Sequence, residues 1–527
     1  MAENRRFWVM AALGGGVLAG VALPPLALAP LLWLALVPLW SLAQRPRAGA
    51  APLLAGLWGL AAVLVGHRWL LWLHPLDWVG VPGPLSLPLC LLIWLLCGLA
   101  GALLVAAWAV LVRRLDGRRL STALLAALVW GLVEVALARG PLFWIGLGAA
   151  ALPLDPPLAG LGAIGGSGLV AAAQLLMAWA LWRLLLPGPQ RRRRLLLITL
   201  LLLGLHGAGA WALAANGAPP LPPLQPVPQR WLVLQPAIPT REKFEPLQQG
   251  RLLRLLQGAQ REAAGAAADG LLLPEGALAL GQQLPEPAAL EVLSGGFRLV
   301  GNQQRSSLLR FPLGGRQPLP GIDKHRLVPL GEWVPGAGML SWAGLSAVGG
   351  LSPGVPSRLL ARPQGSIAVA ICYELSDGAA LARAVRQGAG WLVATANLDP
   401  YPSQLRGQFQ ALARQRAIET GRWLVSAANT GPSLVVDAQG RLRQQLPAAV
   451  ATTGLMEVLP LARLTPYDRW GERPLLLLLL ALGIGRWLGF WIGRSATTTG
   501  VATGVGPGVA TAESGGAPAG PPAPPRG

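Results

Sequence analysis

The chain has few of the residues that form disulfides or metal sites. Its 527 residues include three cysteines, and two of these, Cys90 and Cys97, lie in one apolar run. This arrangement excludes a disulfide framework. The four histidines are scattered and have no metal-ligand spacing. The sequence therefore predicts neither a disulfide scaffold nor a metal site.

Lysine is also nearly absent. The chain carries 43 Lys plus Arg, yet only Lys243 and Lys324 are lysines. Arginine thus serves wherever a generic cation is enough, whereas lysine is a compact point charge whose proton can be removed. Lys324 is therefore a candidate functional cation. The alternative is that it is a chance survivor in an arginine-biased composition.

Long apolar runs dominate what is present. Hydrophobic residues make up 53% of the chain, which also holds 22 Trp. This composition predicts an integral membrane protein, because a helix of about 20 apolar residues crosses a bilayer. Seven runs precede residue 217, one follows residue 473, and a polar block separates them. The expected spans are residues 7–23, 26–42, 52–73, 87–112, 120–138, 163–186, 195–214 and 474–492.

Arginine placement orients these spans. Arginines gather at the N-terminus and in alternate loops, whereas the loops near residues 74–86 and 139–162 hold one arginine and two aspartates. The positive-inside rule then places the N-terminus in the cytoplasm, the polar block outside and the tail inside. The net charge of +20 could suggest nucleic-acid binding, but most of it is this cytoplasmic edging. The arginines concerned are Arg5, Arg6, Arg45, Arg47, Arg113, Arg114, Arg118, Arg119, Arg183 and those at 191–194.

The chain is expected to divide into four parts. Residues 1–217 form a seven-span domain, 225–465 an external domain, 466–494 the last span and 495–527 a disordered cytoplasmic tail rich in Gly, Ala, Thr and Pro. A cleaved signal peptide at the N-terminus is the alternative. It fits less well, because apolar spans continue directly after it and the topology needs the first span.

The polar block alternates short apolar runs with helical segments. Runs that are apolar on both faces are typical of buried strands covered by helices. The block is therefore an α/β layered domain, with functional residues expected at strand ends. The expected strands are 231–235, 270–274, 297–301, 307–311, 367–372, 391–396, 423–427 and 433–436, and the expected helices are 245–268, 378–387 and 403–420.

Three chemistry-bearing residues follow such runs. Glu275 ends the run 271–273, Lys324 comes next along the chain, and Cys372 is the only cysteine outside an apolar span. A thiol with a base and a fixed cation beside it is a nucleophile for acyl transfer. Taken singly, Cys372 could be an inert core residue and Glu275 part of a solvated turn.

The motifs together resemble one enzyme superfamily. Pro-Glu at 274–275, Lys-His-Arg-Leu-Val-Pro-Leu-Gly-Glu at 324–332 and Ile-Cys-Tyr-Glu at 371–374 are similar to the nitrilase superfamily. Eight spans around an external domain narrow the resemblance to its membrane-embedded members, the apolipoprotein N-acyltransferases. Further similar elements are Trp130, Glu134, Phe143, Trp144, Leu234-Gln235-Pro236, Lys243, residues 416–422, Asn429-Thr430-Gly431 and residues 465–467.

The resemblance implies a fold and a set of roles. The fold is a membrane α-helical bundle of about eight spans with an external nitrilase-like α-β-β-α sandwich. Cys372 is the nucleophile, Glu275 is the general base, and Lys324 holds the oxyanion and helps to keep the thiolate. Two departures concern the substrate pocket: Ala-Asn-Leu-Asp-Pro-Tyr at 396–401 replaces the usual Ser-Asn-Asp-Ala-Trp-Phe-Gly, and Phe244 stands where tryptophan is common.

Supporting roles follow from the same resemblance. Glu332 is the additional carboxylate that orients Lys324 or the acceptor amine, and a backbone N–H near Tyr373 is a second oxyanion donor. Glu374 supports the site, with an arginine partner as its alternative role, and His325 is structural. Glu332 could otherwise be an exposed loop acid.

The implied reaction has two steps and needs no cofactor. Cys372 takes an acyl chain from a membrane phospholipid as a thioester and passes it to the N-terminal amine of diacylglyceryl-cysteine in an apolipoprotein. The resemblance places such a protein, as a monomer, in the bacterial inner membrane with its catalytic domain on the periplasmic side. A membrane-tethered amidase that admits water, and a non-catalytic scaffold or transporter, are the alternatives.

Two charged residues lie in or near apolar spans. Arg68 and Glu134 could form an ion pair at the outer leaflet, because charge within a membrane is usually paired. A water-exposed helix end is the alternative for Arg68.

Overall fold

The computed structural model describes residues 5–44, 50–77, 81–187, 191–218, 227–329, 331–333, 350–399 and 401–499. The chain divides into two compact units, Met1–Leu479 and Leu480–Gly527. The first holds the apolar helices and the α/β domain. The second holds the C-terminal part of α14 (Arg473–Thr499). The part of the expected tail from residue 500 onward, and residues 219–226 between the two expected domains, lie outside the described residues.

The N-terminal part consists of helices that follow the apolar runs. Among the described residues, α4, α5, α7 and α8 are long and apolar enough to cross a membrane, while α2 and α3 are shorter apolar helices. The expected span 52–73 is wrong as one helix, because α3 ends at Gly66 and a 3-10 helix, η1, follows. The bounds are α1 (Arg5–Ala22), α2 (Ala29–Ala43), α3 (Ala51–Gly66), η1 (Arg68–Leu73), α4 (Gly83–Arg114), α5 (Leu120–Ala138), η3 (Leu147–Ala150), α6 (Pro156–Gly160), α7 (Gly162–Leu185) and α8 (Arg191–Gly217).

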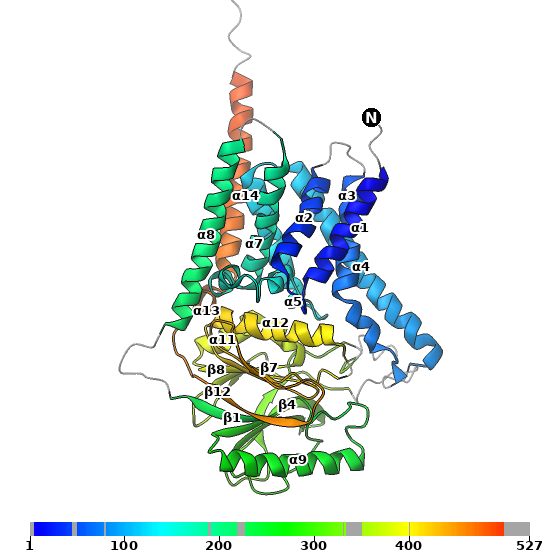
Figure 1. The fold of residues 1–527 in the computed structure, drawn as a ribbon, viewed down its shortest axis with the longest axis vertical. Coiled ribbons are helices and arrows are strands. Elements are labelled where there is room, and N and C mark those ends of the chain that lie inside the picture. The colour runs from blue at the N-terminus through cyan, green and yellow to red at the C-terminus, as the bar shows by residue number, and fades with distance from the viewer. Residues whose placement is uncertain are drawn as a thin grey trace, which may run out of the picture. The chain divides into compact units, whose positions relative to one another are not determined.

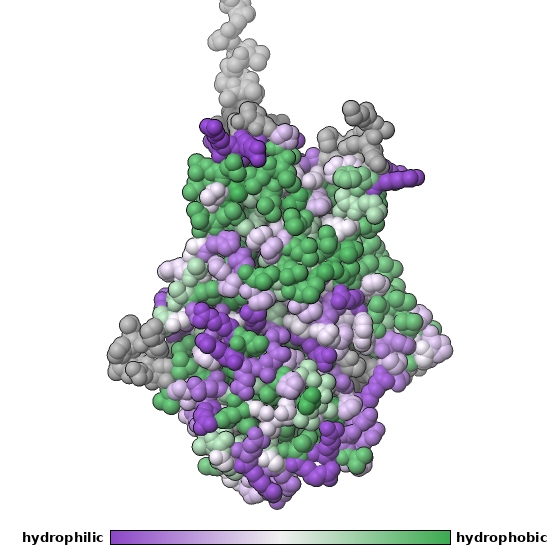
Figure 2. All heavy atoms as spheres, viewed as in Figure 1, coloured by the Kyte–Doolittle hydropathy of each residue, from purple (hydrophilic) through white to green (hydrophobic). Residues whose placement is uncertain are grey.

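Small residues allow these helices to approach closely. A Cβ on Gly131 of α5 would lie 2.1 Å from the carbonyl oxygen of Gly168 in α7, and one on Gly16 of α1 would lie 2.3 Å from that of Trp58. Close backbone contact at glycines is typical of helices packed in a bilayer. Outward-facing leucines such as Leu103 of α4 and Leu203 of α8 are exposed. Figure 2 shows the resulting apolar surface in green.

The polar block folds into two six-stranded sheets. Their orders are β12-β1-β2-β3-β4-β5 and β11-β10-β9-β8-β7-β6. In the first sheet β1, β2 and β3 run parallel, and in the second β7, β8 and β9 do. The strands are β1 (Gln229–Gln235), β2 (Gly270–Leu273), β3 (Glu291–Val300), β4 (Gln303–Phe311), β5 (Leu319–Asp323), β6 (Leu359–Leu360), β7 (Ile367–Ile371), β8 (Trp391–Ala396), β9 (Leu424–Ala428), β10 (Leu434–Val436), β11 (Leu442–Gln445) and β12 (Thr452–Val458).

The two sheets pack face to face and helices cover their outer faces. Trp231 of β1 and Trp391 of β8 meet in the core between the sheets, with ring centroids 5.4 Å apart. Helix α9 (Pro246–Gly265) packs on the first sheet. On the second lie α11 (Gly378–Arg386) and α12 (Ser403–Thr420). The arrangement is an α-β-β-α sandwich, as predicted.

Helix α12 lies between the sandwich and the apolar helices (Figure 1), and the loop after β5 also contacts these helices. Gln408 of α12 donates a hydrogen bond to the carbonyl oxygen of Gly66, at 3.0 Å. Arg326 donates to the carbonyl oxygens of Ala138 and Gly140, at 3.0 and 2.7 Å. The loop that follows β5 is therefore held against the end of α5.

Candidate active site

Lys324 lies between two carboxylates. It directly follows β5, and its side chain is fully buried. Its Nζ donates to Glu275 Oε1 and to Glu332 Oε1, both at 2.7 Å. Burial alone would lower the pKa of this ammonium, but Glu275 and Glu332 outweigh burial and raise it well above its usual value. Lys324 is therefore a permanent cation, which a buried site tolerates only when it is paired in this way.

Glu275 is positioned by the end of β2. Its Oε1 accepts a hydrogen bond from Lys324 Nζ, and its Oε2 accepts one from the backbone N–H of Asn397 at 3.2 Å. The next residue, Gly276, has φ +57° and leaves no room for a Cβ, which would lie 2.7 Å from Lys243 Nζ. The tight turn at glycine therefore brings the carboxylate and both lysines of the chain together.

Cys372 occupies a sharp turn after β7. The strand ends at Ile371, and Cys372 begins a 3-10 helix, η5 (Cys372–Ser376), with φ +56°. This is one residue earlier than the predicted strand end, and a left-handed conformation in a non-glycine residue is costly. The turn brings the thiol close enough to Glu275 and Lys324 that both charges act on it.

The thiol of Cys372 is not a resting thiolate. Burial and the negative charge of Glu275 raise its pKa well above the usual value, although Lys324 acts in the opposite direction. Lys324 therefore favours the thiolate, but in the free protein burial and Glu275 outweigh its effect on the thiol pKa. A base has to remove the proton during attack, and Glu275 is the carboxylate whose charge acts on the thiol most strongly.

Glu374 joins the cysteine strand to the lysine loop. This carboxylate is 3% exposed and accepts hydrogen bonds from the backbone N–H groups of His325 at 2.7 Å, Arg326 at 3.1 Å and Ile371 at 3.0 Å. Its charge is balanced by Arg358 Nη1, 2.7 Å from Oε2. Glu374 therefore fixes the spacing between Cys372 and Lys324, and Arg358 neutralises its buried charge.

The remaining predicted residues surround this centre. Glu332 Oε2 accepts from the backbone N–H of Val328 at 2.9 Å, so the carboxylate is held on Lys324 rather than exposed. Burial raises the pKa of Glu332, although Lys324 acts against this. The Tyr373 ring faces Lys324 Nζ, 5.9 Å from its centroid. His325 Nδ1 pairs with the carbonyl oxygen of Gly354 at 2.7 Å, in a structural position.

Sequence reasoning gave no role to three residues that meet the site. Asn397 binds Glu275 through its backbone, and its side chain donates to Thr240 Oγ1 at 2.8 Å. Lys243 is buried and donates to the main-chain oxygen of Glu275 at 3.4 Å. Its rarity as one of two lysines was a usable signal. Arg358 had none, because arginine is common throughout the chain.

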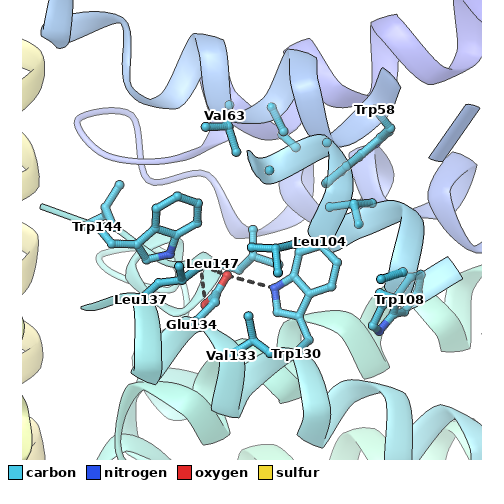
Figure 3. Close-up of a pocket in the computed structure, with 18 of the residues that line it drawn as sticks. Trp58, Val63, Leu104, Trp108, Trp130, Val133, Glu134, Leu137, Trp144 and Leu147 are labelled. Atoms are coloured by element: carbon cyan, nitrogen blue, oxygen red, sulfur yellow. Dashed lines mark hydrogen bonds between the residues drawn. The ribbon is translucent and has the colours of Figure 1, made fainter. Parts of the chain in front are cut away.

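The suggested pair between Arg68 and Glu134 is wrong. Within the described helices, Glu134 accepts from Trp130 Nε1 at 2.8 Å and from the backbone N–H of Leu147 at 3.0 Å (Figure 3). Arg68 instead donates to the carbonyl oxygen of Val65 at 3.4 Å. Aromatic and backbone N–H donors thus satisfy the buried carboxylate without a cation.

Comparisons with known proteins agree with this architecture. Residues 15–181 match the family model for the apolipoprotein N-acyltransferase N-terminal domain, and residues 321–466 match that for carbon-nitrogen hydrolase. An apolipoprotein N-acyltransferase of Prochlorococcus marinus is 49% identical over 92% of this chain and 97% of its own. The chain belongs to the apolipoprotein N-acyltransferase family.

Other members and the wider superfamily are also similar. The apolipoprotein N-acyltransferase of Parasynechococcus marenigrum is 47% identical over 90% of this chain and all of its own. The structure of Saccharomyces cerevisiae Nit3, of the nitrilase superfamily, covers 44% of this chain and 90% of its own at 16% identity, with a TM-score of 0.33. Membership in the apolipoprotein N-acyltransferase family makes this protein an N-acyltransferase, and its apolar helices indicate a membrane protein.

Proposed function

We propose that this acyltransferase moves an acyl chain from a membrane phospholipid, through a thioester on Cys372, to the N-terminal amine of diacylglyceryl-cysteine in an apolipoprotein. One observation carries the proposal: Lys324 Nζ donates to Glu275 Oε1 at 2.7 Å, and the charges of both groups act on the Cys372 thiol. A base, a nucleophile and a fixed positive charge thereby converge on one point.

In the first step, the Cys372 sulfur attacks the ester carbonyl of the lipid. Glu275 accepts the thiol proton, and Lys324 stabilises the negative charge that develops on the carbonyl oxygen. Collapse of the intermediate breaks the ester bond, and the proton on Glu275 moves to the departing glycerol oxygen. The products are an acyl thioester and a lysophospholipid.

In the second step, the acceptor amine attacks the thioester carbonyl. Glu275 takes a proton from the amine and returns it to the departing sulfur, which restores the thiol. Glu332, bonded to Lys324 at 2.7 Å, keeps the cation aimed at the carbonyl oxygen. It is also a second carboxylate that can accept a proton from the acceptor amine. No metal takes part in this scheme.

The setting follows from the substrates, which are both lipids. We place the 225–465 domain on the periplasmic side of the bacterial inner membrane, held by seven spans within 1–217 and an eighth within 466–494. The four long apolar helices and the loop arginines support this arrangement. A reporter fused after Ala214 should give a periplasmic signal, and one fused after Arg494 a cytoplasmic signal. The reverse pattern would overturn the topology.

Labelled phospholipid without acceptor tests the chemistry. Wild type should become labelled on Cys372 and release lysophospholipid, whereas Cys372→Ala should do neither. Glu275→Gln should also fail, because an amide cannot take the thiol proton. If wild type released free fatty acid as fast without acceptor as it transfers the chain with it, the protein would be an amidase-like hydrolase instead.

A further inference from the structure

The apolar helices line a cavity that the reaction scheme does not use. It has a volume of about 330 Å³ and lies between α1, α3, α4 and α5 (Figure 3). Its wall is almost wholly apolar and includes Trp58, Trp108 and Trp130. An apolar wall of this kind offers water few hydrogen-bond partners and therefore suits an apolar ligand.

The cavity runs from the catalytic domain toward the opposite side of the helices. His67 lines the near end, beside Gly66, whose carbonyl oxygen is bonded by α12 of the catalytic domain. Leu111 lines the far end, close to the arginines that end α4. Along α4 the lining extends from Gly101 to Leu111, which is roughly 15 Å at the rise of an α-helix.

Aromatic residues separate the near end from the thiol. The Trp69 ring lies 5.8 Å from that of Phe143 and 5.9 Å from that of Tyr401. Tyr401 is close enough to Cys372 that the two interact electrostatically. The near end of the cavity and the nucleophile therefore face the same cluster of rings.

The near end carries two polar atoms without partners among the described residues. Trp144 Nε1 and His67 Nε2 are both buried, and neither has a hydrogen-bond partner within the described part of the chain. His67 is 4% exposed, and its Nδ1 lies 3.2 Å from the Val63 carbonyl oxygen, which only accepts. Nδ1 therefore carries the proton, which leaves Nε2 of the neutral ring as an acceptor. The His67 and Trp144 rings stack at 4.7 Å.

One donor and one acceptor, both unpaired in the part of the chain that the structure describes, lie side by side at the mouth of an apolar cavity, and together they indicate which polar groups a bound ligand would carry. Buried groups of this kind are costly unless they are satisfied. The ligand must have an aliphatic chain whose head offers both an oxygen that accepts and a hydroxyl that donates. A lysophospholipid has this head, because it keeps one ester carbonyl next to the hydroxyl freed by acyl transfer.

We propose that the cavity holds the acyl chain that stays on the donor lipid, with its ester carbonyl on Trp144 Nε1. The hydroxyl freed beside Cys372 binds His67 Nε2 only after the lysophospholipid has moved away from the thiol. This inference rests on the proposed function. The far end at Trp108 and Leu111 then limits the length of the retained chain, while the transferred chain leaves with Cys372.

The test uses purified full-length protein and phospholipids with two different chains. The mass of the adduct on Cys372 identifies which chain is transferred, so the length of the other chain can be varied alone. Leu111→Trp shortens the cavity and should slow adduct formation about tenfold with a long retained chain, at the usual cost of overpacking. With a short retained chain its rate should equal that of wild type. Val129→Phe, on α5, fills the same end and should act alike if Leu111→Trp does not fold.

Two further variants complete the design. Leu103→Trp changes an exposed residue of the same helix, with Leu103 73% exposed, and should match wild type with every lipid. Trp144→Phe keeps the ring and removes the N–H, so KM for the lipid should rise about fivefold with kcat unchanged. The inference is wrong if the filled variants respond to the transferred chain, or show no chain dependence, while wild type forms the adduct. Failure of wild type to form any adduct would instead overturn the proposed function.

Discussion

Replacing Glu374 with glutamine should weaken both the fold and the site. The carboxylate pairs with Arg358, and both side chains are 3% exposed. Glutamine has nearly the same shape, but it leaves the guanidinium as an unpaired buried cation. Its NH2 group also donates hydrogen bonds, although the neighbouring backbone N–H groups and the Arg358 guanidinium are donors as well.

The magnitude follows from the burial of the pair. Removing one partner of a buried ion pair costs about 3–5 kcal/mol. For a domain of this size, such a loss lowers the melting temperature by roughly 10 °C. Because Glu374 also accepts from the backbone N–H groups of His325 and Ile371, Lys324 and Cys372 should lose their alignment, and thioester formation should slow as well.

Denaturation of the purified protein measures this loss, and a double-mutant cycle assigns it to the pair. Arg358→Met alone should also destabilise the protein, whereas Glu374→Gln combined with Arg358→Met should cost at least about 2 kcal/mol less than the two single losses together. Glu286→Gln is the matched control, since its pair with Arg261 is exposed and is worth at most about 1 kcal/mol. Additive losses in the cycle would refute the reasoning.

Three further predictions concern the other charged residues of the site. Lys324→Arg should reduce turnover roughly 100-fold despite keeping the charge, because the planar fork does not fit between Glu275 and Glu332; near-normal turnover would make Lys324 structural. Lys243→Met should stabilise the protein by at most about 3 kcal/mol at pH 7, because burial lowers the pKa of Lys243 to about 8 and so penalises its charged form. That gain should be full below about pH 8 and vanish toward the ordinary lysine pKa of 10.5, and a gain independent of pH would contradict this cause. Glu332→Gln should form the thioester but pass its chain to the amine slowly in single-turnover assays, whereas equal loss in both steps would give Glu332 the same role as Glu275.

Much of this architecture was predictable, and the failures have physical causes. The apolar runs around Trp231 and Trp391 correctly predicted central strands, because a strand that is covered on both faces has to be apolar. Edge strands were missed: β11 is exposed along its length, and the first four residues of β12 are only half-buried, so neither strand stands out by hydrophobicity. The order of Glu275, Lys324 and Cys372 indicated the site, but the contacts of Glu374 did not follow from sequence. They depend on a turn at Cys372 that only the packed fold can impose.

The break after α3 and the partner of Glu134 were likewise beyond sequence patterns. An apolar run does not reveal that His67 ends the helix, since residues 68–73 remain apolar apart from Arg68. Charge pairing in a membrane suggested Arg68 for Glu134, whereas Trp130 and a backbone N–H provided the hydrogen bonds. Tertiary contacts decided both outcomes.

The intact mass of the purified protein after incubation with phospholipid tests the central claim most directly. Wild type should gain the mass of one acyl chain on Cys372, and lose it again when a peptide with an N-terminal diacylglyceryl-cysteine is added. Cys372→Ala should gain no mass, and Cys372→Ser should gain it slowly, as an ester. An acyl adduct on Cys372→Ala, or a wild-type adduct that the acceptor peptide does not remove, would contradict transfer through this thiol.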